Sequence, residues 1–307
     1  MTVLAMVSSM LVAAAVPRTL GVEAGAFLRF GEEPKATGAW AGRRLLWRDE
    51  KPAFELSFWC GTCQFLFRRL EGANDTVSLD GCEPRLAQGI DGLDEEIIDL
   101  FASLLPTGEY LPLLLRVQPQ LVRPAEAGDY FAGEQVATWG VEGFWGLPQH
   151  PQTPYYRTYV ASVNAEAHLY EFIVPMVPPS WNDPARVKRH VERLRTSPRP
   201  TAVAVSILDV CQPATEIDGR DCYAHWALTH FLLDGHHKLQ AAAQIDQPLQ
   251  LLSLLSIDAS LATTEQVRRV PTPTRQPTSA PPNPNRLTPA VTWSSQNIDD
   301  RTGAAPD

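Results

Sequence analysis

The segment Phe231–Ala243, with the sequence FLLDGHHKLQAAA, constrains the fold more than any other part of the chain. An apolar run ends at Asp234-Gly235 and an alanine-rich run follows, which predicts a strand, a tight turn and a helix. Gly235 permits backbone angles that a Cβ forbids and lets a ligand approach the main chain. Because the first amides of a helix lack intrahelical partners and the helix dipole favours negative charge there, we expect this element to hold an anionic, phosphate-bearing ligand.

Three basic side chains, His236, His237 and Lys238, occupy the first turn of this expected helix. Cations are disfavoured at a helix N-terminus, and the sequence offers no structural gain for placing them there. A bound anion would stabilise them, and local departures of this kind tend to mark functional sites. The alternative is structural, since an Asp-Gly turn before a helix is common and a histidine can be satisfied within a core.

The residues around this segment predict a compact α/β unit over residues 166–260. Apolar runs rich in β-branched residues indicate strands, and apolar residues at helical spacing indicate helices. The order is strand, helix, strand, strand, helix, strand. The expected strands are Leu169–Val177, Thr201–Val210, Ala224–Leu233 and Leu249–Ile257, and the expected helices are Asp183–Arg195 and His236–Ile245.

The run DGHHKLQAAA resembles the signature Asp/Gly–Gly–x–His/Arg–Arg–x–x–Ala–Ala of the ParB/sulfiredoxin superfamily. The flanking runs FIVPMVPPSWNDPARVKRHVERL, PTAVAVSILDV, HWALTHFLLDG and PLQLLSLLSID resemble the strands and first helix of that fold. The resemblance covers roughly Glu166–Asp258, under a third of the chain. It implies a ParB/sulfiredoxin-like domain in which Gly235, His236, His237 and Lys238 contact the phosphates of a nucleotide.

The branches of this superfamily imply different activities. Sulfiredoxins use a cysteine within the turn, and here His236 takes that place, so sulfinic-acid reduction is not expected. Chromosome-partition proteins continue into a DNA-binding helix-turn-helix domain, whereas a proline-rich run follows here, so DNA is not an expected partner. The Asp-Gly-His-His turn is most similar to that of the free-serine kinases, which implies ATP with Mg²⁺. Lys238 stands where arginine is usual and contacts phosphate as a point charge without a bidentate fork.

Phosphotransfer to a small hydroxyl substrate needs cations on the phosphate, an acid that holds Mg²⁺ and a base for the hydroxyl. Asp234 is the candidate for the metal and His237 for a catalytic role beside the phosphate. Glu171, Asp183 and Asp209 are the candidate bases, and the sequence does not choose among them. The alternative class is a non-catalytic nucleotide-binding module that regulates or binds a protein partner.

Cys60 and Cys63 form a Cys-x-x-Cys pair with three possible interpretations. The pair can supply half of a tetrahedral zinc site, which Cys82 and a histidine such as His150 would complete. The Trp-Cys-Gly-x-Cys context is also typical of a redox turn. The two thiols can equally be buried and inert, since free cysteine packs like a small hydrophobe.

The first 165 residues predict a separate, mixed and aromatic-rich domain. The helix Asp94–Leu105 and the strand Leu111–Val117 are its clearest elements. The apolar run Val3–Val16 lacks a preceding basic region and is short for a membrane span, which favours a buried strand or helix of a cytoplasmic protein. Residues 261–307 are rich in Pro, Thr and Ser, which predicts a disordered tail.

The charge of the chain narrows the classes of molecule that it is expected to bind. The net charge of −9 disfavours a general nucleic-acid binder, which needs clustered Lys and Arg. The densest basic run, Arg186–Arg199, is interpreted as the solvated face of a helix. Five irregularly spaced cysteines do not form the disulfide framework of a small secreted protein. Together these features predict a cytoplasmic α+β protein that binds a nucleotide and touches no membrane.

Overall fold

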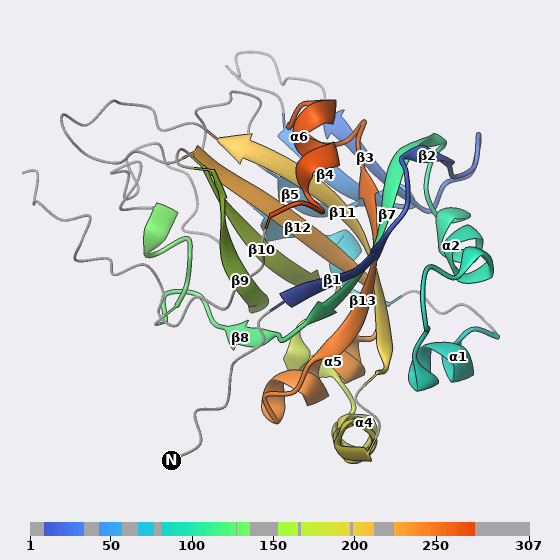
Figure 1. Cartoon of the computed structure of the whole chain (residues 1–307), viewed down its shortest axis with the longest axis vertical. Coiled ribbons are helices and arrows are strands. Elements are labelled where there is room, and N and C mark those ends of the chain that lie inside the picture. The colour runs from blue at the N-terminus through green and yellow to red at the C-terminus, as the bar shows by residue number, and fades with distance from the viewer. Residues whose placement is uncertain are drawn as a thin grey trace, which may run out of the picture.

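The computed structural model describes residues 9–33, 43–56, 67–76, 81–126, 128–135, 153–164, 167–196, 199–211 and 224–273. It is a mixed α+β protein with two sheets and short helices (Figure 1). Within the described residues, no helix is both long enough and apolar enough to cross a membrane.

A nine-stranded sheet forms the centre of the molecule (Figure 1). Its strands lie in the order β1-β7-β13-β11-β12-β10-β9-β8, and β2 also pairs with β7. The strands are β1 (Ser9–Ala14), β2 (Arg18–Leu20), β7 (Gly108–Val117), β8 (Gln120–Val122), β9 (Tyr155–Asn164), β10 (Ala167–Pro175), β11 (Thr201–Cys211), β12 (Ala224–Asp234) and β13 (Leu249–Ser256).

The central strands of this sheet are buried on both faces. β10 pairs with β12 in parallel, β11 pairs with β12 in antiparallel, and β11 pairs with β13 in parallel. Every residue of β13 is buried, as are all but one in β11 and in β12. Their nearly continuous Val, Ile and Leu runs are typical of strands covered on both sides.

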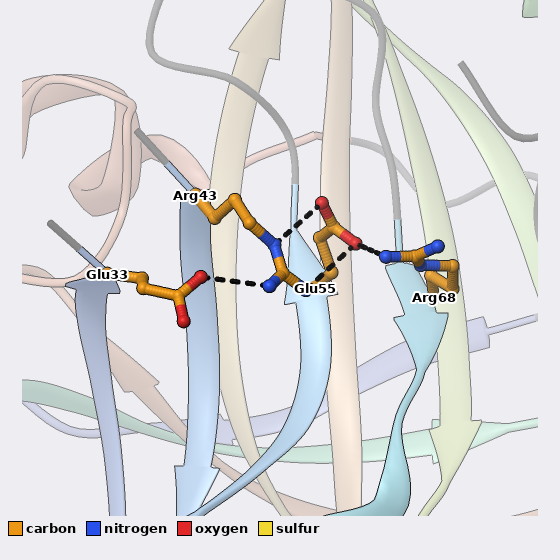
Figure 2. A network of polar contacts seen from close by, with 4 residues as sticks. All are labelled: Glu33, Arg43, Glu55 and Arg68. Carbon is orange, nitrogen blue, oxygen red and sulfur yellow. Dashed lines mark hydrogen bonds and ion pairs between the residues drawn. The ribbon is translucent and has the colours of Figure 1, made fainter. Parts of the chain in front are cut away.

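A second, four-stranded antiparallel sheet packs against the first one. It contains β3 (Leu28–Glu33), β4 (Arg43–Arg48), β5 (Lys51–Leu56) and β6 (Phe67–Arg69) in that order. A chain of ion pairs crosses its four strands from Glu33 to Arg43 to Glu55 to Arg68 (Figure 2). Opposite charges on neighbouring strands stabilise the pairing of a sheet.

Two apolar clusters cover the two faces of the large sheet. One joins it to the small sheet and to α1 (Glu83–Gln88) and α2 (Glu95–Ala102). The other joins it to α4 (Pro184–Thr196), α5 (His236–Gln244) and α6 (Thr264–Arg269). The large sheet is therefore the middle layer, and α4 and α5 lie side by side at one end of it (Figure 1).

The large sheet contains strands from both sides of the boundary expected near residue 165. β7 pairs with β13 along eight residues, and β9 pairs with β10. The elements expected after that residue form close to their expected bounds, and α2 begins at its expected N-cap, Asp94, which accepts a hydrogen bond from Ile97 N. Residues 1–165 and 166–260 thus contribute neighbouring strands to one sheet.

Two expectations about the ends of the chain need correction. Of the apolar run Val3–Val16, the structure describes residues 9–16, and these include the edge strand β1. The strand was expected, but its burial was not correct, since Met10 and Val12 are 45% and 41% exposed and Val16 is 77% exposed. The segment that follows residue 261 is not disordered throughout. Helix α6 begins at Thr264 and has a capping box between Thr263 and Gln266. Its Val267 lies in the core, fully buried.

A continuous row of buried polar side chains crosses five strands of the large sheet. Thr158 donates a hydrogen bond to Glu171, and Glu171 Oε1 lies 3.3 Å from His230 Nε2. His230 Nδ1 lies 2.6 Å from Ser206 Oγ, which lies 2.8 Å from Ser253 Oγ. All five residues are buried, and we call them the polar row.

Candidate functional site

The turn between β12 and α5 has the left-handed backbone that the sequence predicts. Gly235 is the N-cap of α5 with a φ of +100°, and as a glycine it has no side chain that could cap the helix. A Cβ at this position would lie 2.6 Å from the Cβ of Ala202. Glycine is therefore required twice, by the backbone angle and by the close approach of β11.

Lys238 is tied to the body of the protein by two hydrogen bonds. Its Nζ donates to Asp234 Oδ2 at 2.7 Å and to the carbonyl oxygen of Thr201 at 2.8 Å. The lysine side chain is 5% exposed. The ammonium is therefore neutralised by the preceding carboxylate and holds the turn onto β11.

His236 is buried and accepts a hydrogen bond from the main chain. Its Nε2 lies 3.1 Å from Met176 N, which donates to it. An imidazole that accepts at Nε2 is neutral and carries its proton on Nδ1. Burial lowers the pKa of His236 to about 4, in agreement with a neutral ring.

His237 makes the matching contact one residue later. Its Nε2 accepts from Asp183 N at 3.2 Å, just before the start of α4. The pKa of His237 is lowered, chiefly by burial and next by the positive charge of Arg186. Both imidazoles thus anchor the Met176–Asp183 connection to α5.

The expectation that the three basic residues gain nothing structurally is wrong. Each of them has a partner within the fold, and two of the partners lie more than fifty residues away in sequence. The positive charge in the first turn is reduced accordingly, since both imidazoles accept hydrogen bonds and Lys238 pairs with Asp234. Local charge no longer supports an anion at this turn by itself.

A cavity of about 200 Å³ nevertheless opens beside the turn. Residues of α1, α2, the N-terminal part of α4 and the β12–α5 turn border it, together with Thr76 and Cys82. Its lining residues are Thr76, Cys82, Glu83, Phe101, Arg186, Leu233, Asp234, Gly235, His236 and His237. Four of the five residues expected at the site therefore line one cavity, whereas Lys238 is not among its lining residues.

Arg186 contributes a guanidinium to the wall of this cavity. It lies 3.1 Å from Glu83 Oε1, and the two side chains are 45% and 72% exposed. Exposed ion pairs contribute little free energy, so this pair can give way to a bound anion at small cost. The sequence shows Arg186 only as part of a basic run. Arg186 lies far from the turn along the chain, and only the fold brings the two together.

Cys82 also lines the cavity, which no local sequence signal indicates. The thiol is buried, and burial raises its pKa, with a further increase from Asp234 and a smaller opposing effect from Lys238. A raised pKa keeps the sulfur protonated and unreactive at neutral pH. Cys82 thus lines the cavity with a thiol that burial keeps in its protonated form.

A second and larger groove of about 560 Å³ lies between α4 and α5. Pro184, Val187 and Lys188 from α4 line it together with Gln240 and Gln244 from α5. Asn182, which also lines the groove, donates to Gln240 Oε1 and to the carbonyl oxygen of His236. Lys188 is the one charged side chain among the residues that line this groove.

None of the three candidate bases lines the cavity. Glu171 belongs to the polar row, and Asp209 forms a buried ion pair with Arg44. Asp183 accepts a hydrogen bond from Ala185 N at 2.8 Å at the start of α4. The polar row has the carboxylate, imidazole and hydroxyl of a nucleophilic triad. Its residues line neither the cavity nor the groove, so it gives a substrate no access there.

The zinc hypothesis falls outside the described residues, since Cys60, Cys63 and His150 are not among them. Within the described ranges, no three His, Cys, Asp or Glu side chains are arranged to hold a metal ion. Asp234 and Glu83 supply the carboxylates of the cavity, and Glu83 is paired with Arg186. Mg²⁺ commonly binds through one or two protein carboxylates together with substrate phosphates, so Asp234 fits the ion only in company with a ligand.

The chain matches no protein-family model, no curated protein and no solved structure. The resemblance of Glu166–Asp258 to the ParB/sulfiredoxin superfamily therefore stays a prediction.

Proposed function

We propose that the protein binds a phosphate-bearing small molecule, a nucleotide such as ATP, in the cavity beside the β12–α5 turn. The observation that carries this proposal is the cavity itself, in which the N-terminus of α5 meets Arg186. Helix α5 has nine residues, and Gly235 offers no capping side chain to its first amides. Such a helix end attracts anions.

The donors around the cavity suit a phosphate group. Arg186 supplies a guanidinium, whose planar fork matches phosphate oxygens. The Nδ1–H groups of His236 and His237 are the remaining ring donors, because each Nε2 accepts from the main chain. Thr76 adds a hydroxyl to the same wall. In this arrangement Arg186 takes over the phosphate contact that the resemblance assigns to Lys238.

A second candidate function is phosphotransfer to a small hydroxyl substrate. It is favoured by one observation, the presence of Asp234 and His237 in the same cavity. In the presence of a nucleotide, Asp234 would hold Mg²⁺ through the oxygen that Lys238 leaves open. In a non-catalytic binding module neither residue takes part in a reaction. A measurement of turnover therefore distinguishes the two candidate functions.

The binding proposal is tested by calorimetric titration of the whole chain with MgATP and with Mg²⁺ pyrophosphate. We expect Arg186→Ala to weaken both roughly 10-fold or more, since a charge-assisted hydrogen bond contributes about 1.5–3 kcal/mol. Lys188→Ala is the matched control, because Lys188 lies on the same helix but lines the groove. Equal effects of the two variants, or no binding by the unaltered chain, would contradict the proposal.

Turnover is measured with the same samples. Release of phosphate from ATP, or its transfer to a hydroxyl acceptor, that Asp234→Asn abolishes without preventing nucleotide binding supports phosphotransfer. Nucleotide binding with no turnover supports the non-catalytic module. The variant needs a check of its fold, because Asp234 also pairs with Lys238.

A further inference from the structure

The cavity is too small for a whole nucleotide. Its volume of about 200 Å³ lies below the roughly 300–1,000 Å³ of pockets that enclose a ligand of that size. A phosphate group fits inside, and the remainder of the ligand has to extend over the rim. The residues of the rim therefore decide which phosphate compounds bind well.

An exposed tryptophan lies next to two residues that are hydrogen-bonded to the histidines of the cavity. Trp181 is 57% exposed, more than any other large aromatic side chain among the described residues. The next residue, Asn182, donates to the carbonyl oxygen of His236, and Asp183 N donates to His237. These two contacts hold the residues that directly follow the tryptophan against the first turn of α5, whose histidines line the cavity.

A cation covers one side of the Trp181 ring. The Arg69 guanidinium lies 4.8 Å from the ring centroid. Arg69 in turn donates to the carbonyl oxygen of Ala73 and to Asn74 Oδ1, in the segment that leads to Thr76 on the cavity wall. The stacked pair of Trp181 and Arg69 thus connects two of the segments that border the cavity.

From this placement we propose that Trp181 and Arg69 form a stacking platform for the planar aromatic ring of the ligand. The inference rests on the proposed function, because the ligand's phosphate must occupy the cavity. Aromatic side chains hold nucleobases by stacking regardless of base identity, and an arginine adds a cation–π contribution. The platform makes the site selective for nucleotides over inorganic phosphates.

The experiment compares MgATP with inorganic tripolyphosphate on the whole chain. We expect the unaltered protein to bind ATP more tightly than tripolyphosphate. Trp181→Ala is expected to weaken ATP roughly 10-fold or more and to leave tripolyphosphate unchanged, while Trp181→Phe retains most of the ATP affinity. Arg69→Ala weakens ATP, and the matched control Arg29→Ala, which removes the cation stacked on Trp47, does not.

The outcomes separate the two proposals. If tripolyphosphate binds as tightly as ATP and Trp181→Ala changes neither affinity, the platform is wrong and the cavity proposal stands. If neither compound binds the unaltered chain, both proposals are overturned. A loss of both affinities in Trp181→Ala and Trp181→Phe alike also contradicts the platform, because the ring would then act through the structure of the cavity.

Discussion

His236 makes the stability of the protein dependent on pH. Its pKa is lowered from 6.5 to about 4 by burial, so the folded state resists a proton that the unfolded chain binds readily. The stabilising contribution is complete above the unfolded pKa and is lost as the pH falls from about 6.5 towards 4. We expect the free energy of unfolding to fall by about 2 kcal/mol from pH 7 to pH 5 on account of this residue alone.

Urea unfolding of the unaltered chain and of His236→Gln at both pH values checks this expectation. Glutamine can still accept from Met176 N but does not titrate, so the variant is expected to lose less stability on acidification. His190 and His225 also have lowered pKa values, about 4 and about 3, and add to the loss in both proteins. An identical pH dependence in the two proteins would refute the assignment to His236.

At the residue scale, some of the site was readable from the sequence and some was not. The requirement for Gly235 followed from the turn alone. The pairing of Asp234 with Lys238 has an i, i+4 spacing, which the sequence shows directly. The hydrogen bonds from Met176 and Asp183 to the histidines join residues 60 and 54 positions apart, and no local pattern contains them.

At the scale of elements, the small sheet depends on Glu55. This side chain is 11% exposed and pairs with Arg43 and Arg68 on the two neighbouring strands (Figure 2). We expect Glu55→Gln to lower the free energy of unfolding by about 1–2 kcal/mol, because two arginines lose a partly buried counter-charge. The control is Glu126→Gln, whose pair with Arg123 is mostly exposed and contributes little. Equal losses in chemical denaturation would contradict this view.

Elements with a strong local pattern were predictable. Long apolar runs gave β11, β12 and β13, and the Asp-Pro start gave α4. Helix α6 carried a readable signal too, since Thr263 and Gln266 have the spacing of a capping box, but the prolines that follow obscured it. The short strands of the small sheet were not predicted individually, because their stability comes from partners rather than from their own sequence.

At the scale of the whole molecule, one buried ion pair joins the two sheets. Arg44 on β4 lies 2.7 Å from Asp209 Oδ2 on β11, and the two side chains are 4% and 8% exposed. Arg44 also donates to the carbonyl oxygen of Ala259, and Asp209 accepts from Leu261 N. The pair thus fixes the small sheet, the large sheet and the chain leading to α6 at one point.

Removing one partner of this pair leaves an uncompensated buried charge. We expect Arg44→Met to cost about 3–5 kcal/mol of unfolding free energy, and the double variant with Asp209→Leu to cost less than the sum of the single ones. Denaturant unfolding of all four proteins completes the cycle. Strictly additive losses would show that the two side chains do not interact.

The assembly of the two sheets could not be predicted from the sequence. Arg44 and Asp209 lie 165 positions apart, and β7 pairs with β13 across more than a hundred residues. Periodicity shows which faces of an element are apolar but not which other element covers them. The cavity depends on the same long-range packing, so Thr76, Cys82 and Arg186 could not be assigned to it beforehand.

The polar row has a consequence for how the large sheet reaches its final pairing. Each of its five strands contributes one hydrogen-bonding side chain to a layer that is otherwise apolar. If one strand slipped by a single residue, its polar group would move to the other face and its neighbours in the row would lose their partners. Each wrong alignment would thus bury unpaired polar groups, which is expensive. The row therefore selects for the native register of the five strands, because that register leaves none of these polar groups unpaired.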